Sequence, residues 1–63
     1  MDKLTVKQAR KIADLSITEM AKRLGLSSNG YLYKEQGKRR FYVDEAIKFS
    51  KAVGIPIENI LFY

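Results

Sequence analysis

The side chains able to do chemistry in this 63-residue chain are mostly cations and neutral hydrogen-bonding groups. Twelve Lys and Arg residues oppose seven Asp and Glu residues, for a formal net charge of +5, and the chain contains neither His nor Cys. The lack of imidazole and thiol groups removes the commonest metal ligands, proton shuttles and nucleophiles. The sequence also has no paired carboxylates, no nucleophile beside a base and no glycine-rich phosphate loop. We therefore expect a binding protein, not an enzyme, with no metal and no cofactor.

Cations and hydrogen-bonding side chains gather in the middle of the chain. Ser28 and Asn29 stand between Lys22 on one side and Lys34 on the other, and the run Lys38–Arg40 comes soon after Lys34. Lys and Arg bind phosphates through ion pairs, and amides and hydroxyls read base edges through hydrogen bonds. This combination favours a polyanionic partner, although a basic face of this kind can also be merely solvated.

Two short helical patterns joined by a tight turn must position these side chains. Ser16 and Glu19 have the spacing of a capping box and are followed by apolar residues at helical spacing: Ile17, Met20, Ala21 and Leu24. Gly25 can take the left-handed conformation that ends a helix, and Ser27 can cap a second helix, which we expect over residues 28–36. This arrangement predicts a helix-turn-helix over about 16–36, whose second helix can enter the major groove of double-stranded DNA.

The rest of the chain predicts three more helices and no strand. Thr5 and Gln8 form another capping box, so the first helix should begin near Val6 and run to about Asp14. Its inward face would be Val6, Ala9, Ile12 and Ala13, with Lys7, Arg10 and Lys11 outside. A later helix should end at Gly54, with an apolar face made of Val43, Ala46, Ile47, Phe49, Ser50 and Val53.

Pro56 is expected to open a last helix over about 57–62, because proline is tolerated in a first turn. The predicted fold class is therefore all-α, with five short helices in a single domain over residues 1–63. A chain of this size leaves little room for a large cavity, so we expect no small-molecule ligand. No apolar run of about 18 residues and no signal-peptide pattern occurs, which predicts a cytoplasmic protein without membrane contact.

The order of these motifs resembles the Cro/CI-type, lambda-repressor-like helix-turn-helix family over nearly the whole chain. The resemblance rests on Leu15-Ser16, Ala21, Leu24-Gly25-Leu26-Ser27, Glu35-Gln36-Gly37 and the segment 54–61. The sequence departs from the family pattern at two positions, because Ile17 stands where a Gln is common and Lys34 where an apolar residue is usual. The resemblance implies a bundle of short helices that binds double-stranded DNA and regulates transcription.

In the register that this resemblance implies, one face of the helix 28–36 reads bases. The residues on that face are Ser28, Asn29, Leu32, Tyr33 and Gln36. Tyr31 would turn inward. Asn29 is the best candidate, because its amide can pair with the N6 and N7 edge of adenine, although it could also be a polar residue of a first helical turn. Leu32 and Tyr33 would contact thymine methyls or sugars, or alternatively belong to the core or to an interface.

The resemblance also implies phosphate contacts around this helix. They would come from Ile17, Lys22, Ser27, Lys34, Lys38, Arg39 and Arg40. Main-chain amides at a helix start can bind phosphate without a special side chain, which is the role open to Ile17. At Lys34, either the stem packs while the ammonium reaches outward, or the register of the helix is shifted by one residue.

A dimer is expected because one helix reads too few base pairs alone. Two-fold pairing would place equivalent reading residues about 34 Å apart on an inverted repeat. The candidate interface is the apolar tail, Ile57, Ile60, Leu61, Phe62 and Tyr63. The alternative is that part of this tail packs on the first helix.

Together these features predict a sequence-specific transcriptional regulator of double-stranded DNA, most similar to a small phage or mobile-element repressor that acts as a homodimer. One alternative is an excisionase-like or MerR-like winged domain, in which residues 34–43 form a hairpin with Arg39 and Arg40 at its tip. Another is an antitoxin-like or antirepressor-like protein-interaction module, favoured by Ile17, Leu32 and Tyr33.

Overall fold

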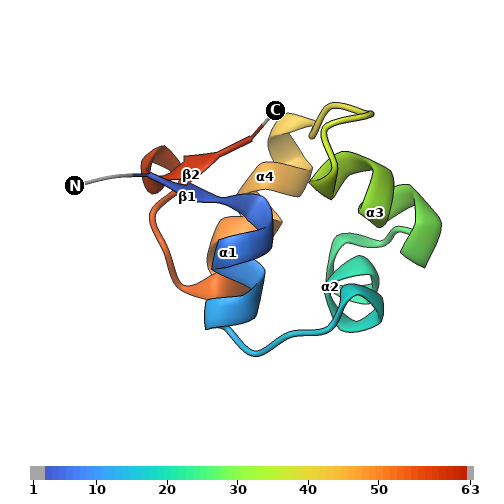
Figure 1. Ribbon diagram of the computed structural model, residues 1–63, viewed down its shortest axis with the longest axis horizontal. Helices are drawn as coiled ribbons and strands as arrows, with labels where there is room; N and C mark the ends of the chain where they lie inside the picture. Colours follow the sequence, from blue (N-terminus) through green and yellow to red (C-terminus); the bar gives the residue numbers. More distant parts are fainter. Residues whose placement is uncertain (1–2, 63) are drawn as a thin grey trace.

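Four α-helices, one short 3-10 helix and two very short strands build the fold in the computed structural model, which describes residues 3–62. Figure 1 shows α2 and α3 side by side at one end of the molecule and the strand pair toward the other. In chain order the elements are β1 (Leu4–Thr5), α1 (Val6–Ile12), α2 (Ile17–Leu24), α3 (Ser28–Glu35), α4 (Val43–Val53), η1 (Ile57–Asn59) and β2 (Ile60–Leu61).

The first two helices begin where the predicted capping boxes place them. The Gln8 amide donates to Thr5 Oγ1 at 3.1 Å, and the Thr5 amide donates to Gln8 Oε1 at 2.9 Å. Ser16 and Glu19 exchange the same two hydrogen bonds, each at 3.1 Å. Long-range contacts are not needed to start these helices, because a capping box satisfies two of the free amides of a helix start by local bonds alone.

The turn between α2 and α3 also follows its sequence. Gly25 has φ = 71°, a left-handed conformation that an L side chain rarely adopts, and it ends α2. The Leu26 amide then donates to the Ala21 carbonyl at 2.8 Å, and Ser27 Oγ accepts from the Gly30 amide at 3.0 Å. These bonds close one helix and start the next, so the predicted helix-turn-helix is present.

The core lies between α1, α2, α4 and the inward side of α3. Its buried apolar side chains are Val6, Ala9, Met20, Ala21, Leu24, Tyr31, Ala46, Phe49 and Ile60. Phe41 and Phe62 pack against this core, with their ring centroids 5.1 Å apart and their planes near perpendicular. Phe49 lies against both rings, at 6.0 and 5.7 Å, so an aromatic cluster joins α4 to the tail.

The prediction of a last helix through residue 62, and of a chain without strands, was wrong. Only Ile57–Asn59 is helical, as a single 3-10 turn, and β2 then pairs in parallel with β1, Leu4 opposite Ile60 and Thr5 opposite Leu61. Ile60 is extended and only 4% exposed. Pairing with β1 satisfies the backbone of this segment while burying its apolar side chains, which a short isolated helix would do less well.

The hairpin of the winged alternative is also absent. Within residues 3–62 the only strands are β1 and β2, and the segment 38–42 between α3 and α4 has no strand pairing. Its Phe41 side chain packs inward on the aromatic cluster. The extended character of Phe41, Tyr42 and Val43 therefore belongs to a loop and to the first residue of α4.

Two predicted helix faces were wrong as well. Ile12 is 64% exposed at the end of α1, whereas Arg10, predicted to lie outside, is buried. In α4, Val43 and Ile47 are exposed, and Glu45 lies inside beside Ala46. The stripe that faces the core is shifted in both helices because it includes a charged residue whose partner lies on another helix.

Candidate nucleic-acid interface

The outer face of α3 carries polar side chains that are open to solvent. Ser28, Asn29, Tyr33 and Gln36, the last of them capping the end of the helix, are exposed. Leu32, the remaining predicted base-reading residue, is partly buried. Tyr31 points inward and is fully buried, as the sequence indicated. Residue spacing along α3 therefore separates an outer face from a face that holds the helix in place.

The start of α2 lies next to the start of α3. Ser28 Oγ donates to Thr18 Oγ1 at 3.4 Å, which places these two exposed hydroxyls together. Ile17 is partly buried and packs against the core, so α2 offers its amide groups here and not this side chain. Thr18 is not among the contact residues predicted from the sequence, although its place beside Ile17 at a helix start was the available signal.

On the inner face of α3, Glu35 joins a buried network with α1. Arg10 donates through Nε to Glu35 Oε2 at 2.8 Å and through Nη2 to Glu35 Oε1 at 3.2 Å. Arg10 Nη1 also donates to the Leu15 carbonyl at 2.8 Å, and the Tyr31 hydroxyl donates to Glu35 Oε2 at 2.6 Å. A two-pronged Arg–carboxylate contact fixes direction as well as distance, so α3 is oriented against α1.

The charges of this network follow from its geometry. Burial alone would raise the pKa of the Glu35 carboxyl, but hydrogen bonds from Arg10 and Tyr31 and the charge of Arg10 outweigh burial and lower that pKa. Burial and the hydrogen bond to Glu35 raise the pKa of the Tyr31 phenol, so it stays a neutral donor. The hydrogen bond to Glu35 raises the pKa of Arg10. At neutral pH each group is therefore in the protonation state that the network needs.

A second buried ion pair joins α3 to α4. The Lys34 ammonium contacts Glu45 Oε1 and lies 4.5 Å from the centroid of the Tyr42 ring. Glu45 Oε1 also accepts from the Tyr42 amide at 2.9 Å, which caps α4. Both side chains of the pair are less than a tenth exposed. The alternative in which the Lys34 ammonium reaches outward is therefore not what the structure has, and its charge is matched inside the protein.

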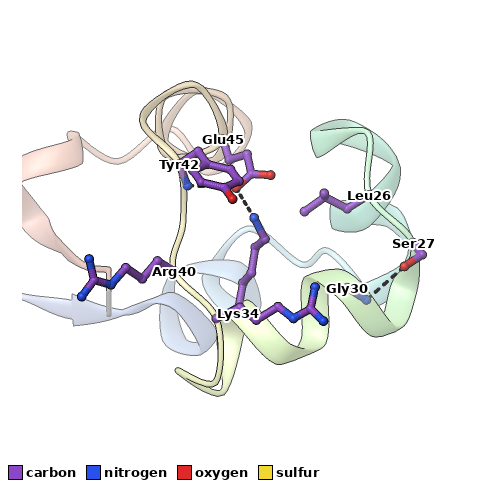
Figure 2. A pocket seen from close by; sticks show the side chains of 8 residues that line it. Leu26, Ser27, Gly30, Lys34, Arg40, Tyr42 and Glu45 are labelled. Atoms are coloured by element: carbon purple, nitrogen blue, oxygen red, sulfur yellow. Dashed lines mark hydrogen bonds and ion pairs between the residues drawn. The ribbon is translucent and has the colours of Figure 1, made fainter.

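A pocket of about 610 Å³ opens between α3, α4 and the loop that joins them. Figure 2 shows Lys34 crossing this pocket from α3 toward Glu45 and Tyr42. Its lining brings together four residues predicted to contact phosphate: Ser27, Lys34, Arg39 and Arg40. Arg39 and Arg40 are exposed, as are Lys38 in the same loop and Lys22 on α2. Three exposed cations of one loop, none of which forms an ion pair within residues 3–62, thus follow directly after the exposed face of α3.

The apolar tail serves mainly the core of its own chain. Ile60 is buried, Phe62 belongs to the aromatic cluster, and Leu61 is partly buried in β2. Ile57 is the most exposed of the described tail residues, at 38%. Tyr63 lies outside the described residues. The structure therefore favours the alternative in which most of this tail packs within the chain, and Ile60 is not part of an exposed dimer surface.

Between residues 3 and 62, His, Cys, Asp and Glu form no group of three or more that could hold a metal ion. Over the same part of the chain, no helix combines the length and the apolar character needed to cross a bilayer.

Comparison with known proteins identifies one family. A family model described as helix-turn-helix matches residues 6–60, which cover α1 to the start of β2. The comparisons with curated proteins and with solved structures gave no match.

Proposed function

The chain belongs to the Cro/CI-type helix-turn-helix family of DNA-binding transcription regulators, and from this premise we propose that it is a sequence-specific repressor from a small phage or mobile element. The observation that carries this proposal is the exposed polar face of α3, followed directly by the exposed cations of the loop 38–40. A face of this kind suits a major groove, and cations beside it suit the phosphates on either side.

Base reading is assigned to the outer face of α3. Asn29 is free to pair with the N6 and N7 edge of adenine, and Ser28 can bind a base or a phosphate. Leu32 and Tyr33 supply apolar contacts, and Gln36 lies at the far edge of the face. Asn29 is the residue for which we expect the largest loss of discrimination on substitution.

Phosphate binding is assigned to the groups around this face. They are the amides at Ile17, the Ser27 hydroxyl and the side chains of Lys22, Lys38, Arg39 and Arg40. We leave Lys34 out, because its ammonium is buried against Glu45. A phosphate that replaced Glu45 as its partner would leave the buried Glu45 carboxylate with the Tyr42 amide but without a counter-charge, which is unfavourable.

We further propose that the protein binds an inverted repeat as a homodimer. Ile57 and the exposed parts of Leu61 and Phe62 are the tail surface open to this contact. A second candidate is the face of α4 that carries Val43 and Ile47, because these side chains are 76% and 44% exposed and lie one turn apart. Sedimentation of I57D and V43D tests the two surfaces. Loss of the dimer in one variant identifies it, and a monomeric wild type bound to DNA as a monomer contradicts the proposal.

The test of DNA binding is selection from a pool of random duplexes at moderate salt, followed by mobility shift. We expect an enriched inverted repeat with half-sites about one helical turn apart. Lys51→Ala removes a cation of α4 outside the proposed contacts and should select the same motif. A flat selection profile would overturn sequence-specific binding. In that case, a protein partner whose affinity survives high salt would instead support an antitoxin-like or antirepressor-like module.

Repression is tested separately in cells. The selected operator is placed over a promoter that drives a reporter, where occupancy alone would block transcription. Expression should fall when the wild-type chain is supplied and should recover with N29A. A rise in expression would indicate an activator, and an unchanged level would contradict operator binding in the cell.

A further inference from the structure

The Tyr33 ring lies on the outer face of α3, close to two cations of the following loop. Lys38 Nζ is 5.6 Å from the ring centroid and Arg39 Cζ is 5.8 Å from it. The Tyr33 carbonyl also accepts from the Lys38 and Arg39 amides, at 2.9 and 3.3 Å. The ring and the carbonyl of one residue are therefore held by the same two neighbours, although the side chain is 40% exposed.

Arg39 links the Tyr33 ring to the pocket between α3 and α4. It lies over the Tyr33 ring, and it lines the pocket with Ser27, Gly30 and Arg40. A phosphate held at that pocket would fix the Arg39 guanidinium. A cation fixed beside an aromatic ring restricts where the ring can lie, because the ring quadrupole attracts it. The backbone contact and the ring position are thus linked through one side chain.

The groups that Tyr33 leaves open match one base. Among residues 3–62 its hydroxyl makes no hydrogen bond, whereas the buried Tyr31 uses its own hydroxyl on Glu35. Tyr33 therefore presents an apolar ring edge beside a free O–H donor. In the major groove, thymine presents its C5 methyl group beside the O4 acceptor, and no other base offers an apolar group next to an acceptor.

We propose that Tyr33 is a specificity-determining residue that reads a thymine, and that Lys38 and Arg39 are positioning residues for its ring. Phosphate contact by the loop and base reading by α3 are then energetically coupled. The inference rests on the proposed DNA-binding function. It adds the base that is read, thymine, the residue that reads it, Tyr33, and a coupling between phosphate contact and base reading.

The experiment uses the operator selected by the full chain, with each thymine replaced in turn by uracil, which removes only the methyl group. In one position per half-site we expect uracil to weaken wild-type binding by about three- to fivefold, the effect of one buried methyl. Y33F should keep this ratio and lose affinity for both duplexes. Y33A should bind thymine and uracil operators equally. Thermal melting of both variants checks folding, and Y33F keeps the test valid if Y33A is unfolded.

The coupling is tested with K38A and R39A on the same pair of duplexes. If these cations only attract phosphate, both variants weaken binding while the thymine-to-uracil ratio stays at its wild-type value. If they position the ring, that ratio falls toward one. K48A removes an exposed cation that lies over no aromatic ring of residues 3–62, and it is the matched control for charge.

The outcomes distinguish failure of DNA binding, of thymine reading by Tyr33 and of the coupling through Lys38 and Arg39. A wild-type chain that selects no motif overturns the DNA-binding function and this inference together. A selected motif whose thymine-to-uracil ratio is the same in Y33A and wild type overturns the role of Tyr33 alone. An unchanged ratio in both K38A and R39A overturns the coupling and leaves thymine reading by Tyr33 in place.

Discussion

The two faces of α3 use polar residues in opposite ways. On the inner face, Lys34 and Glu35 are buried and paired with α4 and α1. On the outer face, Asn29 and Tyr33 have side-chain polar groups that make no hydrogen bond within residues 3–62. The inner groups fix the orientation of the helix, and the outer groups stay free for a ligand. A helix without a simple apolar stripe is thus held by ion pairs on one side and left open on the other.

The two inner ion pairs also differ from each other. Arg10 and Glu35 form two bonds, and the Tyr31 hydroxyl adds a third to the same carboxylate. Lys34 instead shares Glu45 with the amide that caps α4. The first pair therefore depends on a complete network, whereas the second carboxylate keeps a partner when its lysine is removed.

Substitution of Glu35 on the inner face of α3 should have the largest effect on stability. Glu35→Ala leaves the Arg10 charge buried without its carboxylate, which should destabilise the fold by about 3–5 kcal/mol. For a chain of this size that is a large part of the total free energy of unfolding. Urea unfolding followed by circular dichroism measures the change. Tyr31→Phe keeps the ion pair and should cost about 1 kcal/mol. A change below about 1 kcal/mol in E35A would show that the network does not hold α3.

At Lys34 we expect a smaller loss. Lys34→Ala removes one charged partner from Glu45, whose bond to the Tyr42 amide remains, so a loss of about 2 kcal/mol is expected. The double variant K34L/E45Q removes both charges and keeps an acceptor for the cap. Its free energy of unfolding should return to within about 1 kcal/mol of wild type. A double variant as unstable as K34A would mean that the charges themselves are required.

Substitution of Asn29 tests the open face. Because this side chain is exposed, Asn29→Ala should change the free energy of unfolding by less than about 0.5 kcal/mol. Discrimination between the selected operator and a duplex altered at its adenine should fall by about 1–3 kcal/mol. Fluorescence anisotropy on the two duplexes measures this difference. An equal loss of affinity on both duplexes would place Asn29 on the backbone and not on a base.

Acid should give the mildest change, because a protonated Glu35 keeps its packing. The pKa of Glu35 is lower in the folded chain than its ordinary value of 4.5, so its contribution to stability is complete above about that pH and is lost as the pH falls through the folded value. Urea midpoints at pH 7 and pH 3 should differ less in E35Q than in wild type. E19Q, which alters an exposed cap, should keep most of the wild-type difference. Equal differences in wild type and E35Q would contradict this assignment.

The local parts of the fold could be predicted from sequence. The capping boxes at Thr5 and Ser16 and the left-handed Gly25 depend on residues within a few positions of one another, and all three are where the sequence places them. The resemblance then supplied the register that leaves Asn29 outward and Tyr31 inward. These features need no knowledge of which helix lies against which.

Long-range partners explain what could not be predicted. The sequence places Arg10 on an outward face and Lys34 at a phosphate, because their partners Glu35 and Glu45 are brought to them only by the packing of α1, α3 and α4. The pairing of β1 with β2 joins opposite ends of the chain and leaves no local period in the sequence. The expectation that Pro56 opens a helix over about 57–62 therefore pointed to the wrong element for Ile60 and Leu61.

That strand pairing ties the first described segment of the chain to the last one. Leu4–Thr5 and Ile60–Leu61 lie side by side in parallel, so residues 3 and 62 leave the pair at opposite ends. A linker long enough to run back along the pair could join them, and the chain could be reopened elsewhere. A circular permutant opened after Gly37 would keep every helix and both buried ion pairs, yet it would cut the covalent tie between α3 and the loop 38–40. Such a rearranged molecule would separate the architecture of the domain from its ability to recognise a sequence.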